Sequence, residues 1–176
     1  MIYFKPKHFK ASDGSHIPVL VRMVLATTGP ILELGTGFYS TPLLHWLCVA
    51  AKRRLVSCES HPSYYAVALN YATDWHKIVL VDDWDKLDLT PGTDPLLRWS
   101  FVLVDHGPGP RRRVEFHRVA NLADYIVAHD TEPNNDKYYH YSFIADIYRY
   151  RYDYTKLYPN TSVFSNFHSL EWLRDL

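Results

Sequence analysis

The chain has 176 residues, 47% of them apolar, which is the composition of an ordinary globular domain. Nineteen basic residues balance nineteen acidic ones, so no general attraction to nucleic acid or to an anionic membrane is expected. No apolar run approaches the ~20 residues of a membrane span, and the N-terminus lacks the apolar core of a signal peptide. We expect one domain over residues 1–176, with no membrane association.

The predicted elements alternate between helix and strand after a polar lead-in. Residues 1–28 hold this lead-in and a first helix at Ile17–Ala26. Such alternation, with short buried apolar runs, is typical of a parallel sheet covered on both faces. Strands are expected at Ile31–Leu34, Leu55–Cys58, Ile78–Val81, Phe101–Val104, Tyr125–Ala128, Tyr154–Tyr158 and Thr161–Ser165. Further helices are expected at Pro42–Lys52, from Ser60 to about Trp75, around Val114–Leu122, at Lys137–Tyr150 and at Leu170–Leu176, with a long loop at Asp85–Trp99.

A glycine turn follows the first strand. The run Ile31–Leu34 ends at Gly35 and Gly37, after which Thr41 is a plausible N-cap and Pro42 suits the first helical position. A turn of this kind lets backbone approach a ligand at a helix N-terminus.

Acidic residues stand where the later parallel strands end. Glu59, Asp82-Asp83, Asp105 and Asp130 occupy these positions, and Glu33 lies inside the first strand. The carboxyl ends of the strands of an open α/β sheet line its ligand crevice. An acidic crevice suits a ligand with hydroxyl groups and positive charge, or a metal ion, better than a bare polyphosphate.

The glycine spacing leaves a nicotinamide cofactor open. Glu59 follows Gly37 at close to the ~20 residues expected for a ribose-binding acid in the dinucleotide fingerprint. Against this reading, Ser40 stands where that fingerprint has its third glycine, and Glu33 lies within the strand.

Several motifs in order resemble class I S-adenosylmethionine-dependent methyltransferases. E-L-G-T-G-F-Y-S resembles motif I, which has an acid, then any residue, then G-x-G. C-E-S at 58–60 is similar to the strand end whose acid holds the ribose. V-D-D-W at 81–84 resembles the adenine-binding segment, and F-V-L-V-D-H-G resembles the segment facing the reacting methyl group. The resemblance implies S-adenosylmethionine held by Glu33, Gly35, Thr36, Gly37, Ser40, Glu59, Ser60, Asp82, Asp83, Trp84 and Asp105.

The resemblance also implies a fold and a reaction side. The fold is a Rossmann-like three-layer α/β sandwich, with a mostly parallel sheet of about seven strands and a reversed last strand. Asp105, His106 and His129 are the catalytic candidates, because a histidine beside an acid can be a tuned base. A structural role for either histidine stays open.

A divalent cation is a second implication. Asp105-His106 and His129-Asp130 resemble segments of the metal-dependent O-methyltransferases, which implies Asp105 and Asp130 as ligands of an ion such as Mg²⁺. The family has Asp-Asn at the second position, where this chain has Asp130-Thr131.

Two other features have alternative readings. Arg111–Arg113 opens a predicted helix and is either a solvated face or a clamp for an anion. Tyr141, Tyr148 and Tyr152 fit one helical face, as core packing or as a stacking wall.

We therefore expect methyl transfer from S-adenosylmethionine to an oxygen or nitrogen of a small molecule. The alternatives are a non-catalytic methyltransferase-like assembly protein and a nicotinamide-dependent enzyme. A homo-oligomer could supply substrate surface, and nucleic acid is disfavoured as a partner. Cys48 and Cys58 read as reduced core thiols, which points to a cytoplasmic location.

Overall fold

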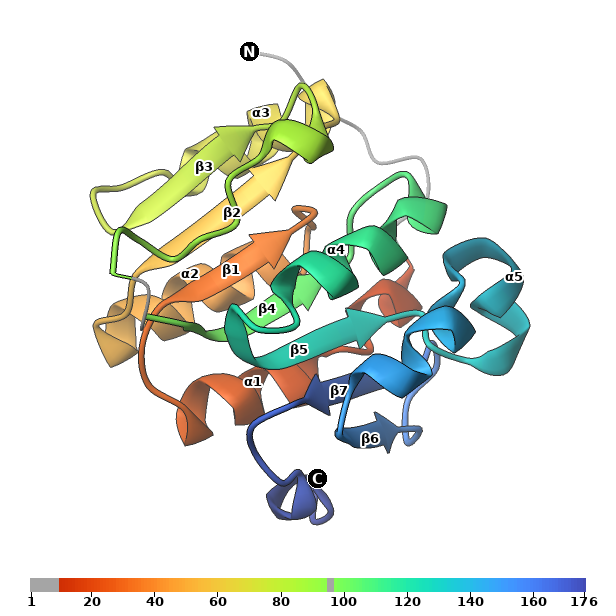
Figure 1. Cartoon of the computed structure of the whole chain (residues 1–176). Helices are drawn as coiled ribbons and strands as arrows, with labels where there is room; N and C mark the ends of the chain where they lie inside the picture. Colours follow the sequence, from red (N-terminus) through yellow and green to blue (C-terminus); the bar gives the residue numbers. More distant parts are fainter. Residues whose placement is uncertain (1–9, 95–96) are drawn as a thin grey trace.

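The computed structural model describes residues 10–94 and 97–176, so part of the predicted lead-in and two residues of the predicted long loop lie outside it. Seven strands form one mixed sheet in the order β3-β2-β1-β4-β5-β7-β6 (Figure 1). The first five strands are parallel, and β7 is antiparallel to both β5 and β6. The predicted sheet with its reversed last strand is confirmed. The strands are β1 (Ile31–Leu34), β2 (Leu55–Glu59), β3 (His76–Leu80), β4 (Trp99–Val104), β5 (Ala123–His129), β6 (Tyr150–Tyr154) and β7 (Thr161–Ser165).

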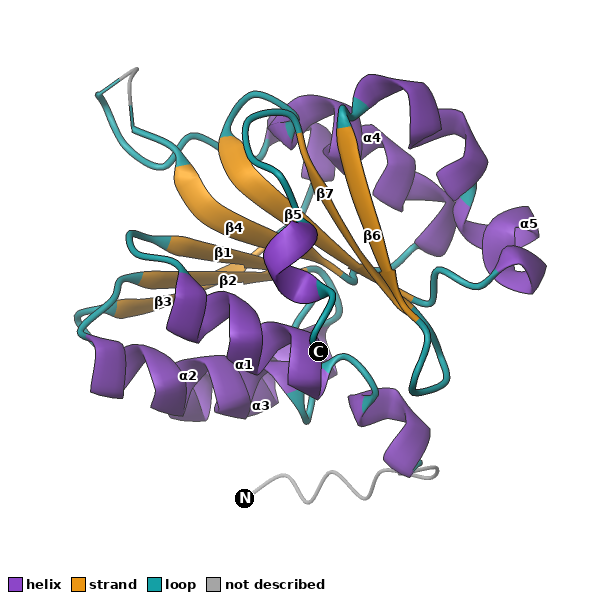
Figure 2. Ribbon diagram, turned by 90° about the horizontal axis from the view of Figure 1, so that it is seen from below, coloured by secondary structure: helices purple, strands orange, loops and turns teal. Residues whose placement is uncertain are grey.

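Helices cover both faces of the sheet, with α1, α2 and α3 on one face and α4 and α5 on the other (Figure 2). Every residue of β1 and β4 is buried, because these central strands are covered on both sides. The helices are α1 (Ile17–Ala26), α2 (Ser40–Ala51), α3 (Pro62–Ala68), α4 (Arg112–Val119) and α5 (Asp136–Tyr139). Short 3-10 helices are η1 (Ala11–Gly14), η2 (Leu69–Tyr71), η3 (Trp84–Lys86), η4 (Gly109–Arg111), η5 (Pro133–Asn135), η6 (Tyr141–Ile147) and η7 (Glu171–Leu173).

The predicted helix at Lys137–Tyr150 is wrong. The helix α5 ends at Tyr139, because His140 has left-handed backbone with φ of 58°, and the chain continues as η6. The last residue of the expected helix, Tyr150, already starts β6, so the strand expected at Tyr154–Tyr158 lies four residues earlier. Tyrosines at alternate positions of β6 pack on one face of the sheet, so their spacing reflects strand period rather than helix period.

Two other sequence expectations are settled by the structure. Tyr141 and Tyr148 lie in the core on the α4 face, which confirms the packing interpretation for them. Cys48 and Cys58 are buried free thiols. In the described part of the chain, no helix is both long enough and apolar enough to span a bilayer.

Candidate functional site

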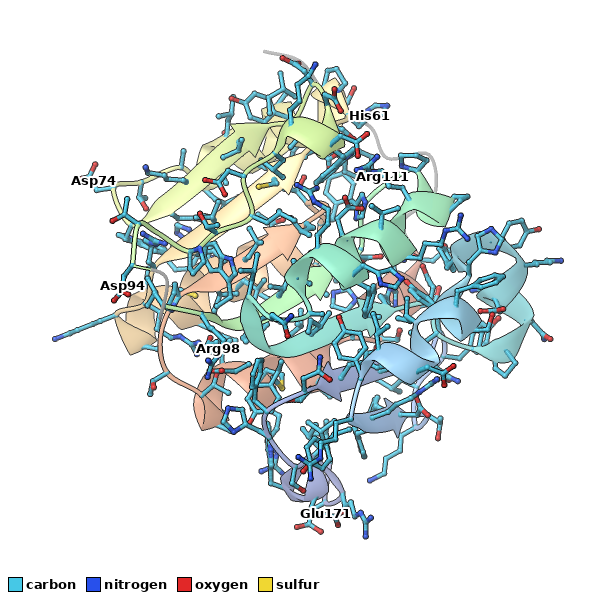
Figure 3. The ribbon with its side chains drawn as sticks, viewed as in Figure 1. His61, Asp74, Asp94, Arg98, Arg111 and Glu171 are labelled. Atoms are coloured by element: carbon cyan, nitrogen blue, oxygen red, sulfur yellow. The ribbon has the colours of Figure 1, made fainter. Side chains whose placement is uncertain are left out.

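A cavity of about 840 Å³ opens at the carboxyl ends of the parallel strands. It lies where the strand order reverses between β1 and β4, the usual ligand position in open α/β sheets. His61, labelled in Figure 3, lines it at the start of α3, whereas Asp74 lies near the opposite ends of the strands. The predicted site residues that line this cavity are Thr36, Gly37, Ser40, Glu59, Ser60, Asp105, His129 and Asp130.

Glu59 at the end of β2 braces the glycine turn. Its Oε2 accepts hydrogen bonds from the backbone N–H of Thr36, at 2.9 Å, and from the Thr36 hydroxyl, at 3.1 Å. Its Oε1 accepts from the backbone N–H of His61 at 2.7 Å. A carboxylate offers about four acceptor positions, so one remains toward the cavity.

Glu33 does not line the cavity, contrary to the role that the motif resemblance implies. Its carboxylate is fully buried and accepts hydrogen bonds from Thr41 Oγ1, at 3.0 and 3.1 Å, and from Ser57 Oγ. Thr41 Oγ1 in turn accepts from the backbone N–H of Gly37 at 3.0 Å. Burial raises the pKa of Glu33 to about 7, against the effect of these hydrogen bonds. Glu33 therefore stabilises the glycine turn through Thr41, and its carboxylate does not face the cavity.

Gly35 is likewise a packing residue in this structure. Its φ is +95°, and a Cβ there would lie 2.5 Å from Cα of His106 and 2.6 Å from the carbonyl of Asp105. The backbone at the end of β4 packs closely against Gly35, and the absence of a side chain at Gly35 makes this contact within the sheet possible.

Asp82, Asp83 and Trp84 do not line the cavity, so the structure does not bring them together with the other residues predicted to hold the cofactor. Asp83 caps η3 by accepting from the backbone N–H of Asp85 and pairs with Lys86 at 3.1 Å, and the chain then turns toward the α4 face. Trp84 is buried there, with its ring 4.3 Å from that of His106. Asp82 is exposed to solvent.

Arg112 occupies the place predicted for a cation between Asp105 and Asp130. Its Nη2 lies 2.8 Å from Asp105 Oδ1, and its Nη1 lies 3.4 Å from Asp130 Oδ2. Tyr139 also donates its hydroxyl to Asp130 Oδ2, at 3.0 Å. The guanidinium therefore pairs with both acids and leaves one net negative charge in the group, and an ion held between them does not fit. Arg112 is buried, so the solvated-face interpretation is wrong for this arginine.

His129 faces the cavity from the end of β5. Its Nδ1 lies 3.6 Å from Asp105 Oδ2 and 3.7 Å from Asp130 Oδ1. Its Nε2 is 2.8 Å from Ser15 Oγ, and this hydroxyl donates to the carbonyl of Pro159 at 2.7 Å. Burial lowers the pKa of His129, but Asp105 outweighs it and the net shift is upward. For Asp105, burial acts to raise the pKa, while Arg112 and His129 hold it well below its usual range.

His106 follows Asp105 in sequence but does not reach the cavity. Its side chain is buried on the α4 face, where Nε2 lies 3.1 Å from Glu115 Oε2. Its backbone carbonyl accepts from Arg112 Nε at 2.9 Å. The structure thus gives His106 a packing position, away from any reacting group in the cavity.

His16 is a site residue that sequence reasoning missed. Arg112 belongs to the Arg111–Arg113 segment that the sequence offers as an anion clamp, and the carboxylates that it holds are those of Asp105 and Asp130. His16 is the residue before α1, lines the cavity with 2% of its surface exposed, and has its ring 4.6 Å from that of His129. Burial and His129 lower the pKa of His16 to about 4. No sequence signal marks His16, because the residues that it meets lie at strand ends far along the chain.

Comparison with known proteins shows the fold and no closer relation. No protein-family model and no curated protein matches the chain. Among solved structures, cofactor-bound Rv0187 from MTB matches with a TM-score of 0.65 at 15% identity, over 94% of this chain and 85% of that one.

Two further matches are O-methyltransferases. TomG from Streptomyces achromogenes, in complex with SAM, has a TM-score of 0.60 at 19% identity, over 92% and 82% of the two chains. The enzyme from Bacillus cereus, in complex with SAH, has a TM-score of 0.58 at 14% identity, over 92% and 84%. The chain has the fold of class I S-adenosylmethionine-dependent methyltransferases.

Proposed function

We propose that this protein is a methyltransferase that uses S-adenosylmethionine. The observation that carries the proposal is the cavity at the β1/β4 switch point, bordered by the glycine turn and by the acidic ends of β2, β4 and β5. Solved structures of the same fold contain SAM or SAH, which supports the same cofactor here.

The residues present fit this cofactor. Gly37 presents backbone to the cavity, and Glu59 keeps an acceptor position for a ribose hydroxyl. The carboxylates of Glu59, Asp105 and Asp130 complement a sulfonium and an ammonium group and would repel the pyrophosphate of NAD. S-adenosylmethionine, when bound, supplies a methyl group carried on a positively charged sulfur.

The acceptor side is formed by Asp105 and His129. We assign His129 as the general base, whose Nδ1 accepts the proton that an oxygen or nitrogen acceptor loses. Ser15 holds the other ring nitrogen, and Asp105 stabilises the charged ring. Holding acceptor and methyl group in line can contribute several kcal/mol. We propose a small molecule as acceptor, since the cavity has walls on two sides, from Asp13 and His16 ahead of α1 and from Pro62 and Tyr64 of α3. A cytoplasmic location and a homo-oligomer remain parts of this proposal.

Calorimetric titration with S-adenosylmethionine, S-adenosylhomocysteine and NAD tests the proposal. We expect the first two ligands to bind with one site per chain and NAD not to bind. Replacing Glu59 with Gln should weaken S-adenosylmethionine binding at least tenfold, because the ribose acceptor loses its charge.

The matched control is Asp82→Asn, which changes an exposed acid at the end of the neighbouring strand and should leave affinity unchanged. Binding of NAD alone would overturn the methyltransferase proposal. S-adenosylmethionine binding without formation of S-adenosylhomocysteine across a panel of hydroxyl and amine acceptors would favour the non-catalytic alternative.

A further inference from the structure

We propose that His16, Asp105 and His129 form a binding site for a divalent transition-metal ion such as Zn²⁺. Each residue offers one ligand atom, and the three atoms lie within 4.8 Å of one another. Two imidazole nitrogens and one carboxylate oxygen are donors that zinc accepts readily, whereas magnesium prefers oxygen ligands. This site differs from the oxygen site between Asp105 and Asp130, where Arg112 already lies.

The first independent observation concerns the hydrogen bonding of the His16 ring. Neither of its nitrogens makes a hydrogen bond within the described structure, although only 2% of the residue surface is exposed. Buried polar side-chain atoms nearly always have a partner, so an unpaired ring at a cavity wall requires an explanation. A metal ion bound at one of the His16 nitrogens would provide it.

The second observation is the way in which the other two ligands are held. Ser15 Oγ donates to the Pro159 carbonyl and therefore accepts from His129 Nε2–H, which leaves Nδ1 directed at Asp105. Histidines that bind metals almost always donate their other ring N–H in this way. Arg112 holds Oδ1 of Asp105 and leaves Oδ2 on the histidine side.

The geometry requires only a small contraction. Ligand atoms about 2.0–2.2 Å from a tetrahedral zinc ion lie roughly 3.3–3.6 Å apart. The His16 and His129 rings already meet edge to face at 4.6 Å between centroids, and Asp105 Oδ2 is 3.6 Å from His129 Nδ1. The three ligand atoms lie within 4.8 Å of one another, so they must approach by about 1 Å, which we expect from rotation of the side chains.

Three protein ligands leave a fourth position, and all three residues line the cavity, so this position faces a bound molecule. With the metal bound, His129 Nδ1 is a ligand and takes no proton, and the metal would lower the pKa of an acceptor hydroxyl instead. This use of the fourth position rests on the proposed methyl transfer, whereas metal binding itself does not.

Titration of the metal-free full chain with ZnCl₂, CoCl₂ and MgCl₂, without S-adenosylmethionine, tests the site. We expect one zinc ion per chain, a Co²⁺ complex with the visible absorption of tetrahedral coordination, and no magnesium binding at the same concentrations. His16→Ala should weaken zinc binding at least 100-fold, and Ser15→Ala should weaken it about tenfold by freeing the His129 ring. His61→Ala changes another histidine of the same cavity and should bind zinc as the wild type does.

The His16 side chain makes no hydrogen bond within the described structure, so its truncation leaves no partner unpaired. Circular dichroism checks that each variant is folded. Absence of stoichiometric zinc binding to the wild type would overturn the proposal. Equal zinc affinity in the wild type and His16→Ala, or loss in His61→Ala alone, would place the metal elsewhere. Failure of S-adenosylmethionine to bind would leave the zinc result unaffected, so the two proposals are tested separately.

Discussion

Gly35 and Gly37 stand two positions apart in the same turn, and their surroundings are different. Gly35 has positive φ and lies against the backbone at the end of β4. Gly37 borders the cavity, and the nearest atom to a Cβ there would be Ser40 Oγ at 3.0 Å. Substitution of the first should therefore affect folding, and substitution of the second should affect ligand binding.

Gly35→Ala should lower the free energy of unfolding by about 2–4 kcal/mol, because strain at positive φ and backbone overlap add. Gly107→Ala is the matched control, since no atom lies within 4 Å of a Cβ at that position. Its effect should stay below about 1 kcal/mol. Urea denaturation of the two variants beside the wild type measures this difference. Similar midpoints for Gly35→Ala and the wild type would contradict the packing role.

At the residue scale, the sequence could predict strand-end positions but not side-chain directions. Asp105 and Asp130 line the cavity as expected, because the carboxyl ends of neighbouring parallel strands meet at one rim. Trp84 and His106 point to the opposite face of the sheet, where they pack on each other. That direction depends on how the chain leaves the strand, and at Trp84 the chain enters η3, which Asp83 caps.

The helix α4 connects several elements through one buried arginine. Arg112 contacts the ends of β4 and β5 through Asp105 and Asp130, and its Nη1 lies 3.2 Å from the hydroxyl of Tyr141 in η6. Three elements that are distant in sequence are thus fixed around the cavity by the first residue of α4.

Arg112→Ala should lower the free energy of unfolding by about 3–5 kcal/mol, because it leaves two partly buried carboxylates without a cation. Arg113→Ala removes the next arginine, which is exposed, and should change stability by less than about 0.5 kcal/mol. Thermal unfolding of the two variants at neutral pH measures the contrast. A loss of the same size in both variants would show that the charge of the segment matters, rather than the buried contacts of Arg112.

At the element scale, prediction fails where one pattern fits two periods. Tyrosines at 150, 152 and 154 alternate as in a strand, while their neighbours at 141 and 148 also fit a helix. The left-handed backbone of His140 ends the helix α5, and nothing in the residue type of histidine signals it. The five parallel strands were predictable because each is a short apolar run between turns.

At the scale of the whole molecule, the described residues form two apolar clusters, one on each face of a shared sheet. Phe116 of α4 belongs to one cluster and Leu44 of α2 to the other, and both side chains are fully buried. Neighbouring residues of the same strand, such as Val102 and Leu103 of β4, point into opposite clusters. We therefore expect the loss of either cluster to destabilise the other through the shared sheet, as the prediction of a single domain over residues 1–176 requires.

Phe116→Ala and Leu44→Ala should each lower the free energy of unfolding by about 2–5 kcal/mol, and each variant should still unfold in one transition. In a background where Trp46, Trp75 and Trp172 are replaced by Phe, tryptophan fluorescence follows the α4 face, where Trp84 and Trp99 are buried. Far-ultraviolet circular dichroism follows the helices of both faces. Coincident midpoints from the two probes in Leu44→Ala would show that damage on the far face unfolds the near face as well. Separated midpoints would mean that the faces unfold independently, and the single-domain prediction would then be wrong. Because the two sites lie on opposite sides of the sheet and share no contact, their effects should add in the double variant to within about 0.5 kcal/mol.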